Sequence, residues 1–164
     1  MAISIRPAVF DDWPTIVEFN RRLAEESEGK RLDLAHVEPG VKALLSDPRK
    51  GRYFIAEANF GESGTPPRIV GQMMHTYEWS DWRNGDIWWL QSVFVHPDFR
   101  RLGVFRALFD RLMSEAEADP NVVGLRLYVE EQNTRAHATY ESLGLAPGGY
   151  FVMERMHRRS VEKA

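Results

Sequence analysis

The sequence predicts an α/β domain in which one mixed sheet is covered by helices on both faces. Three observations predict it. Strand-type runs in the first half are joined by tight turns, as in antiparallel hairpins. A later section alternates strand and helix patterns, which requires a right-handed crossover and a parallel neighbour. The run at residues 87–95 is apolar on both faces except for Gln91-Ser92, as is typical of an interior strand of a covered sheet.

Length and composition favour a single domain spanning residues 1–164, because one core commonly serves roughly 100–200 residues. The formal net charge is −3, and no basic stripe is interleaved with aromatics, so binding to nucleic acid is not expected. The chain has no cysteine, which excludes disulfides, thiolate metal sites and a cysteine nucleophile. Its acid–base chemistry must come from oxygen and nitrogen groups, and no metal is expected.

No stretch of the sequence approaches the roughly 18 uninterrupted apolar residues of a membrane span. The N-terminal residues also lack the apolar core of a signal peptide. We therefore expect a cytoplasmic protein without a membrane partner.

The first elements are a strand and two helices. Residues 3–6 alternate apolar and polar side chains, as in a short strand. Asp11 or Asp12 can cap a following helix, which has a proline in its first turn. Residues 25–33 are polar and predict a connection to a second helix at about residues 37–45.

Three longer strands should follow. Residues 52–58 and 68–79 have strand composition, and the glycines and prolines between them predict a loop at residues 59–67. Asn84-Gly85 is a pair that tolerates positive φ in a tight turn. The strand at residues 87–95 should therefore fold back on its predecessor.

The C-terminal third alternates helix and strand. A broad apolar stripe predicts a helix over about residues 102–118, and residues 123–130 form the next strand pattern. A helix should then begin after Asn133, its N-cap, and end before Gly144. Residues 149–156 predict a last strand.

The segment VFVHPDFRRLGVF, residues 93–105, joins the apolar strand to the long helix. A helix N-terminus presents unpaired N–H groups and suits a phosphate, and Gly103 would let a ligand approach the backbone. Arg100, Arg101 and Arg106 add positive charge. The segment matches neither a P-loop nor a dinucleotide-binding loop. By itself it is equally consistent with a solvated basic turn followed by a core helix.

This segment resembles the acetyl-CoA-binding signature [QR]-x-x-G-x-[GA] of the GNAT superfamily of N-acetyltransferases, with Arg100 and Gly103 matching. Arg101 and Phe105 stand where many members have glycine. About thirty residues downstream, the chain is also similar to the superfamily's N-x-x-A-x-x-x-Y-x-x-x-G-[FL] segment. That pattern is filled by Asn133, Ala136, Tyr140, Gly144 and Leu145.

The resemblance implies a sheet of six or seven strands whose fourth and fifth strands, here residues 87–95 and 125–129, splay apart. In the superfamily, the pantetheine of CoA lies in that gap and bonds to strand backbone that has lost its partner. An N–H aimed at the acetyl carbonyl also stabilises developing negative charge there. The cofactor-binding residues implied are Phe94, Val95, Arg100, Arg101, Leu102, Gly103, Val104, Phe105, Arg106 and Asn133.

The resemblance implies catalytic roles as well. Tyr140 matches the general acid that protonates the departing thiolate. Many members carry a glutamate base in the middle of the fourth strand, whereas this chain has Gln91, which would orient water or substrate instead. Glu78 and His75 are the nearest candidate bases on the preceding strand. They lie on opposite faces, so at most one can reach the site, and Glu78 would act through water.

The activity implied is transfer of an acetyl group from acetyl-CoA to a primary amine of a small molecule or peptide, by direct attack on the thioester. The alternative is a CoA-binding protein without turnover, acting as a sensor. The resemblance also makes a homodimer a candidate assembly. The resemblance also implies an acceptor pocket between residues 27–36 and the tryptophan-rich hairpin at residues 79–86. The composition of that hairpin suggests a cationic amine against the indole faces, with Glu78, Asp81 or Asp86 nearby.

Overall fold

The computed structural model describes residues 1–61, 66–156 and 162–163. Within these residues, seven strands and four helices follow one another, with short 3₁₀ turns at Phe10–Asp12 and Pro97–Phe99. The strands are β1 (Ala2–Pro7), β2 (Arg31–Leu32), β3 (Arg52–Asn59), β4 (Arg68–Ser80), β5 (Gly85–Val95), β6 (Val122–Leu127) and β7 (Glu162–Lys163). The helices are α1 (Trp13–Glu28), α2 (Leu34–Ser46), α3 (Val104–Ala118) and α4 (Thr134–Ser142).

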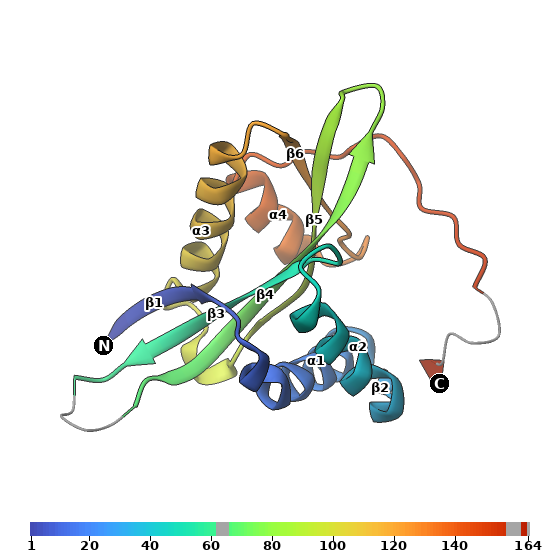
Figure 1. The fold of residues 1–164 in the computed structure, drawn as a ribbon. Coiled ribbons are helices and arrows are strands. Elements are labelled where there is room, and N and C mark those ends of the chain that lie inside the picture. Colours follow the sequence, from blue (N-terminus) through green and yellow to red (C-terminus); the bar gives the residue numbers. More distant parts are fainter. Residues whose placement is uncertain (62–65, 157–161, 164) are drawn as a thin grey trace.

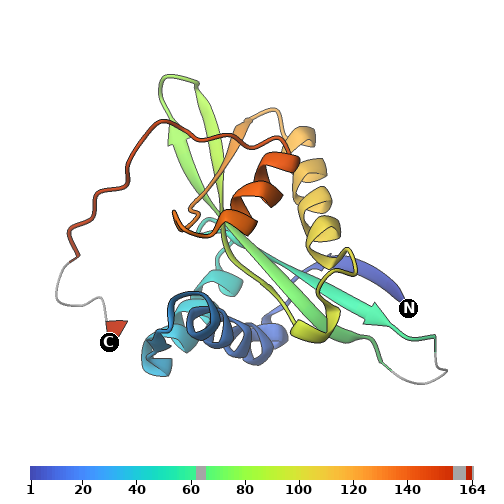
Figure 2. The same ribbon diagram turned by 180° about the vertical axis from the view of Figure 1, so that it is seen from behind.

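Five strands form one sheet in the order β1-β3-β4-β5-β6. Neighbours from β1 to β5 pair antiparallel, and β6 joins β5 in parallel after the crossover through α3. The predicted mixed α/β architecture is confirmed, and the doubly apolar β5 lies inside the sheet as expected. Figures 1 and 2 show α1 and α2 on one side of the strands and α3 on the other.

Each face of the sheet has its own core. On one face, buried residues of α1 and α2 pack against Tyr53, Ile55 and Met74. On the other, α3 lays its apolar stripe, including Leu108 and Leu112, over a larger cluster drawn from β3, β4 and β5. Side chains of a strand alternate between faces, so this division fixes which side each polar residue of β4 and β5 occupies.

Both ends of α1 differ from those predicted. The carboxylate of Asp12 accepts bonds from Arg6 and from the backbone of Val9, so it does not cap α1, and a 3₁₀ turn leads into the helix instead. α1 continues to Glu28 through part of the expected connection, and it ends where Gly29 adopts φ +63°. Residues 25–28 are exposed, and the ion pairs of Arg21 with Glu25 and of Arg22 with Glu26 support this last turn of the helix.

The last predicted strand is wrong. Residues 149–156 form no strand and lie outside the sheet, which therefore has five strands rather than six or seven. A separate two-residue pairing joins β2 to β7. Composition favours an extended conformation for a segment, but a strand also requires a neighbouring strand with which to pair. A local sequence pattern does not reveal whether such a neighbour is present.

The fourth and fifth strands splay as the superfamily resemblance implied; they are β5 and β6 here. Their ladder runs from Asp86 opposite Val122 to Leu90 opposite Leu127 and stops there. Beyond Leu90, β5 keeps only β4 as a partner in the described sheet. A bulge interrupts the β4–β5 register at this point, with Ser92 at φ +48°.

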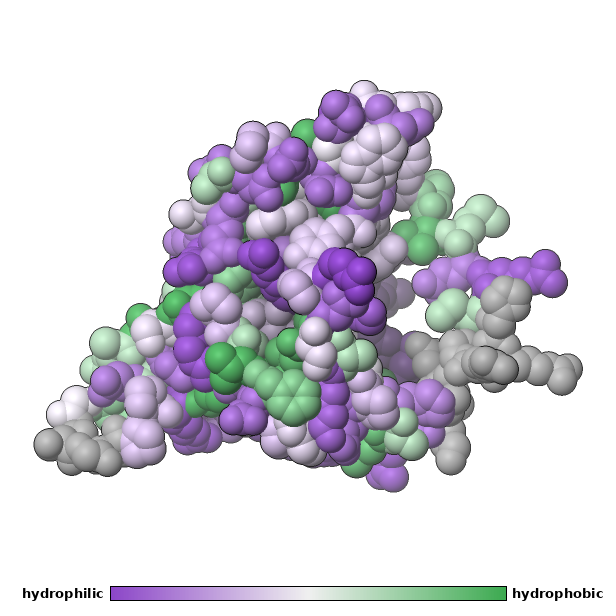
Figure 3. All heavy atoms as spheres, in the orientation of Figure 1, coloured by the Kyte–Doolittle hydropathy of each residue, from purple (hydrophilic) through white to green (hydrophobic). Residues whose placement is uncertain are grey.

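Figure 3 shows a surface dominated by polar residues on the side of Figure 1, with smaller apolar areas among them. In the part of the chain that the structure describes, no helix is both long and apolar enough to cross a membrane.

Candidate active site

The loop between β5 and α3 forms an open backbone cradle. Gly103 is the N-cap of α3 with φ +81° and contributes no side-chain bond, so the first-turn N–H groups of the helix point outward without a side-chain acceptor from the cap. A Cβ added at Gly103 would meet no atom within 4 Å. Arg101, two residues earlier, also has positive φ, at +64°. This geometry fits a polyphosphate seated at a helix N-terminus.

The arginines of this loop are placed differently from one another. Arg100 turns back to the sheet, where its Nε donates to the carbonyl oxygen of Val95 at 2.9 Å and its guanidinium pairs with Glu26 of α1. Arg106 pairs with Asp110 one helical turn along, at 2.8 Å. Arg101 is exposed and has no ion pair within the described part of the chain.

The surroundings of His96 confirm that the loop is basic. Partial burial lowers the pKa of this histidine, and the nearby charges of Arg68 and Arg22 lower it further. The burial effect disfavours any charge, whereas the effect of Arg68 and Arg22 reports positive charge beside the loop. The positive field therefore extends beyond the three arginines identified in the sequence.

The other residues implied for CoA binding differ in exposure and in the elements that they contact. Leu102 is exposed, whereas Val104 is buried in the core under α3. The ring of Phe94 packs on Phe19 of α1, with centroids 4.8 Å apart, and leaves only its backbone at the splay. Asn133 caps α4 by accepting a bond from the N–H of Ala136 at 3.0 Å, as predicted.

Tyr140 lies on α4 and is half-buried. Its ring meets that of Phe105 edge-on, with centroids 5.9 Å apart. Phe105 lies in the first turn of α3, so this contact joins the two sequence segments that resemble the superfamily. Burial raises the pKa of the Tyr140 hydroxyl, which keeps it protonated at neutral pH and able to donate a proton.

A buried polar network lies beneath the bulge of β5, on the face covered by α1. The Nε2 of Gln72 donates to Oδ1 of Asn20 at 2.6 Å and to the carbonyl oxygen of Ser92 at 3.3 Å. The Nδ2 of Asn20 donates in turn to the hydroxyl of Tyr53 at 3.0 Å. Burial raises the pKa of Tyr53, against the opposing effect of its bonds to Asn20 and Ser92.

This network was missed in the sequence, although two signals point to it. Gln72 is a lone amide within the apolar run IVGQMM, and Ser92 is a small polar residue that follows Gln91 within the largely apolar β5. Gln72 has no exposed surface, and its Oε1 finds no partner among the described residues. The face under α1 is therefore the polar face of the splayed region.

Gln91 and Glu78 lie on that face but at different positions along the strands. Gln91 stands at the end of the β5–β6 ladder, where its Nε2 donates to the hydroxyl of Thr76 at 2.7 Å. Glu78 is paired with Ile87, three residues back from the ladder's end, or about 10 Å along the strand. Both of its oxygens are engaged, one by Arg126 at 2.7 Å and the other by the indole N–H of Trp89.

The other candidate groups do not converge on the splay. His75 is fully buried on the opposite face, toward α3. Asp86 is also on the α3 side, because it pairs with Trp79 rather than lying beside Glu78. Of the tryptophans in the hairpin, Trp79 and Trp82 are exposed and form no pocket wall together.

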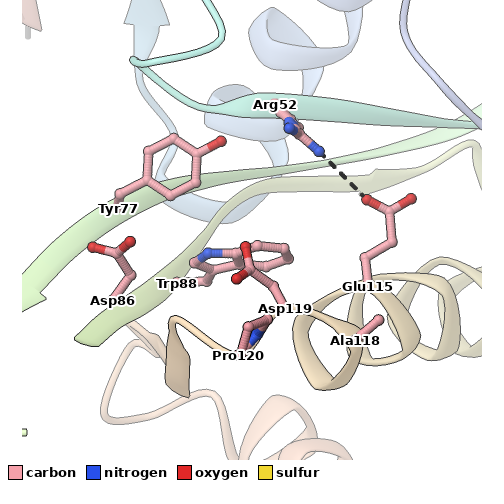
Figure 4. Close-up of a pocket in the computed structure, with 8 residues that line it drawn as sticks. All are labelled: Arg52, Tyr77, Asp86, Trp88, Glu115, Ala118, Asp119 and Pro120. Atoms are coloured by element: carbon pink, nitrogen blue, oxygen red, sulfur yellow. Dashed lines mark ion pairs between the residues drawn. The ribbon is translucent and has the colours of Figure 1, made fainter. Parts of the chain in front are cut away.

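A cavity of about 540 Å³ lies on the α3 side, between the β4–β5 hairpin and the C-terminal end of α3. Figure 4 shows the residues that line it. Arg52 pairs with Glu115 across it at 3.7 Å. The 15 residues of α3 separate this cavity from the cradle at Gly103 by about 22 Å. It is therefore distinct from the splayed strands. It is lined by Arg52, Tyr77, Asp86, Trp88, Glu115, Ala118, Asp119 and Pro120.

Among residues 1–61, 66–156 and 162–163, no group of three or more histidine, aspartate or glutamate side chains is arranged to hold a metal ion.

Comparison with known proteins identifies relatives of this chain. The model of the acetyltransferase (GNAT) family matches residues 13–145, which include both sequence segments discussed above. A ribosomal-protein-alanine N-acetyltransferase of Salmonella typhimurium is 46% identical over 55 residues. That match spans about a third of each protein, 34% of this chain and 36% of the relative.

Solved structures extend the likeness to the whole fold. A protein described as a possible acetyltransferase from Clostridium difficile 630 is 46% identical, with a TM-score of 0.85 over 96% of this chain and 99% of that one. A predicted acetyltransferase from Clostridium acetobutylicum, solved with acetyl-CoA, is 18% identical with a TM-score of 0.74, over 94% and 96% of the two chains. The second likeness is one of fold.

Proposed function

This chain belongs to the acetyltransferase (GNAT) family, and from that premise we propose that it moves an acetyl group from acetyl-CoA to a primary amine of a small molecule or peptide. One observation carries the proposal. The β5–β6 ladder stops at Leu90 and Leu127, and the strand freed there leads into the open helix N-terminus at Gly103. An amide-bearing chain ending in a diphosphate has both kinds of partner in one continuous path.

The residues of this path would divide the work of binding CoA. Backbone N–H groups of residues 103–106 would hold the diphosphate, with charge supplied by Arg101 and the surrounding basic side chains. Backbone of Phe94 and Val95 would bond the pantetheine amides and orient the acetyl carbonyl. In the present structure Arg100 bonds the Val95 carbonyl, so this proposal requires that arginine to yield or share its acceptor.

Two proton transfers accompany attack of an amine on a thioester. An alkylammonium with a pKa of roughly 10 must lose a proton before its nitrogen can attack. We assign this step to a water held by Gln91, which takes the proton from the amine and passes it on to Glu78. Glu78 does not contact the amine directly, because about 10 Å of strand separates it from the splay. Tyr140 gives its proton to the sulfur as the carbon–sulfur bond breaks.

We place the amine on the face covered by α1 and α2. The side-chain amides of Asn20, Gln72 and Gln91 gather on that side, whereas the opposite face beneath α3 is an apolar core. An amine and its departing proton require hydrogen-bond acceptors, which the first face supplies. The alanine N-acetyltransferase similarity of the Salmonella relative favours a peptide amine as one candidate acceptor.

Calorimetric titration with acetyl-CoA tests the binding half of the proposal. Gly103→Asp puts bulk and negative charge into the diphosphate seat and should abolish binding. Gly29→Asp is the matched control, because Gly29 also has positive φ and open space around it but lies at the end of α1. Binding by the wild type and by Gly29→Asp, but not by Gly103→Asp, supports the proposal. Failure of the wild type to bind at millimolar acetyl-CoA overturns it.

A thiol-release assay over a panel of amines and short peptides tests turnover. Free CoA is measured with a thiol reagent, and the protein adds no background because the chain has no cysteine. Release that depends on the amine supports the transferase. Binding without release throughout the panel would favour a CoA sensor, for which the glutamine at position 91 and the engaged oxygens of Glu78 are the relevant observations.

A further inference from the structure

We propose that Asn20, Tyr53, Gln72 and Ser92 form a closed polar ring that positions the freed end of β5 for the reaction. The inference rests on the acetyltransferase function proposed above and gives all four residues a positioning role within it. They act through the backbone of residues 93–95 rather than by contact with the reacting atoms.

The hydrogen bonds of the polar ring close on Ser92. The Nδ2 of Asn20 donates to the Tyr53 hydroxyl at 3.0 Å, and that hydroxyl also bonds the side chain of Ser92. On the other side, Nε2 of Gln72 donates to Oδ1 of Asn20 at 2.6 Å and to the carbonyl oxygen of Ser92 at 3.3 Å. Asn20 therefore links the two arms of the ring, and Ser92 is held both at its side chain and at its backbone.

Ser92 lies at an irregular and strained point of the sheet. Its φ of +48° is in the left-handed region, which is unfavourable for residues other than glycine. Between the pairs Gln72–Phe94 and Met74–Gln91, β5 has two residues opposite one residue of β4. Such a bulge leaves the extra residue without its ladder partner. The side-chain amide of Gln72 gives the Ser92 carbonyl a partner at this point.

The polar ring lies where β5 is least supported by other strands. β6 no longer pairs with residues 93–95 in the described sheet, so these residues are held from β4 and from the α1 face. Two consecutive residues of α1 provide that support. Asn20 holds Ser92 through the polar ring, and Phe19 packs on Phe94 with ring centroids 4.8 Å apart. The direction of the freed N–H and C=O groups therefore depends on the polar ring.

A contribution to stability does not by itself account for the polar ring. Gln72 has no exposed surface, and its Oε1 has no partner among the described residues. A buried acceptor without a partner destabilises the folded state, whereas an apolar side chain of similar shape would not. Together with the strain at Ser92, the fold tolerates two unfavourable features at one place. Features of this kind are typical of positions whose geometry serves a reaction.

The first experiment tests the link between the polar ring and β5 in the absence of any ligand. Tyr53→Phe deletes one hydroxyl and with it the bonds to Asn20 and Ser92. In NMR spectra of isotope-labelled protein, the backbone amide signals of residues 93–95 should shift or broaden. Tyr77→Phe, which deletes a hydroxyl on the α3 face, is the matched control and should leave these signals in place. Unchanged signals in Tyr53→Phe overturn the proposal.

The second experiment separates positioning of the acetyl group from general damage to the site. Tyr53→Phe should lower kcat by about tenfold, since a small displacement of a reacting group reduces the rate strongly. The affinity for free CoA, which carries no acetyl group, should equal that of the wild type in calorimetry, and so should the KM for the amine. Tyr77→Phe should retain the wild-type kcat. A wild-type kcat for Tyr53→Phe, or a parallel loss of CoA affinity, overturns the proposal.

A second variant tests whether the two arms of the polar ring act together. Gln72→Met removes the other bond to Ser92, so it should also lower kcat. In the double variant with Tyr53→Phe the two losses should not multiply, because either substitution already opens the ring. Losses that multiply would mean that the two residues act independently, which contradicts the proposal. Circular dichroism checks that each variant is folded.

The outcomes keep this inference apart from the proposed function. If the wild type fails to bind acetyl-CoA, the proposed function is lost, and the amide signals decide whether the polar ring holds β5. If the wild type is active and Tyr53→Phe matches it in both experiments, the proposed function stands and the polar ring has no role in positioning.

Discussion

The ring of Trp88 stacks on the imidazole of His75 with centroids 4.1 Å apart and planes 22° from parallel. Tyr77 meets the same imidazole edge-on at 5.3 Å. His75 has no exposed surface, and neither ring nitrogen has a hydrogen-bond partner in the described structure. Burial, with a smaller effect from Arg52, lowers its pKa to about 4. The histidine is therefore a neutral aromatic member of the core under α3.

We predict that His75 makes stability depend on pH. The unfolded chain binds a proton at His75 near pH 6.5 and the folded protein only near 4, so stability is lost as pH falls through that window. Urea unfolding should show a loss of about 2 kcal/mol between pH 7.5 and pH 5 from this residue. His75→Phe keeps the stack and should flatten the dependence, whereas His36→Gln, at an exposed site, should not. Equal slopes for wild type and His75→Phe would refute the assignment.

The pair Gln72 and Asn20 should be energetically coupled. Gln72→Met keeps side-chain volume but leaves the buried Oδ1 of Asn20 without its donor, which should cost about 1–3 kcal/mol in denaturant unfolding. Asn20→Leu should cost a similar amount. The double variant should be less destabilised than the sum of the two, by about 1 kcal/mol. Strict additivity would mean that the 2.6 Å bond contributes little.

Removal of the Tyr140 hydroxyl should reduce turnover without weakening acetyl-CoA binding. Tyr140→Phe keeps the ring against Phe105 and deletes only the proton donor, so kcat should fall by about 100-fold. Calorimetry should give an unchanged dissociation constant for acetyl-CoA. Tyr150→Phe, which alters an exposed tyrosine outside the sheet, should leave both quantities unchanged. A wild-type kcat for Tyr140→Phe would remove Tyr140 from the catalytic residues.

Loss of the Glu78 carboxylate should matter only while the amine is protonated. Glu78→Gln should lower kcat/KM by tenfold or more at pH 7. A general base typically contributes about 10²–10⁴ to the rate, and the variant should lose part of that contribution. The deficit should shrink as pH rises toward the amine's own pKa of roughly 10, since a neutral amine needs no base. Arg126→Met, which removes the partner of Glu78 and keeps the carboxylate, is the control. A deficit that is constant across pH would indicate a structural role for Glu78.

The parts of the fold that could be predicted from the sequence are those with a strong local signal. The apolar stripe of α3 and the Asn133 cap of α4 depend on neighbours within one or two turns, and both were located within two residues. The doubly apolar pattern of β5 likewise reflects burial on two sides. Residues 149–156 have an equally strong pattern, but a strand exists only where an edge accepts it.

The candidate site was predicted less completely, because much of it depends on contacts between distant residues. The cradle at Gly103 is local and could be identified from the loop itself. The Asn20–Gln72 bond joins residues 52 positions apart, and the sequence around either residue does not predict its partner. The sequence offers Glu78, Asp81 and Asp86 as alternative neighbours of one amine, whereas strand alternation puts Glu78 and Asp86 on opposite faces of the sheet.

Arg101 occupies a backbone conformation in which an arginine costs roughly 1 kcal/mol more than a glycine. In return for that strain, the exposed side chain of Arg101 gives the cradle at Gly103 a positive charge at its solvent side. Such a charge attracts a polyanion over a distance comparable with the Debye length, so the rate of capture should depend on ionic strength. Arg101→Gly would relax the loop and stabilise the fold, yet slow the arrival of acetyl-CoA in dilute salt and make little difference near 1 M.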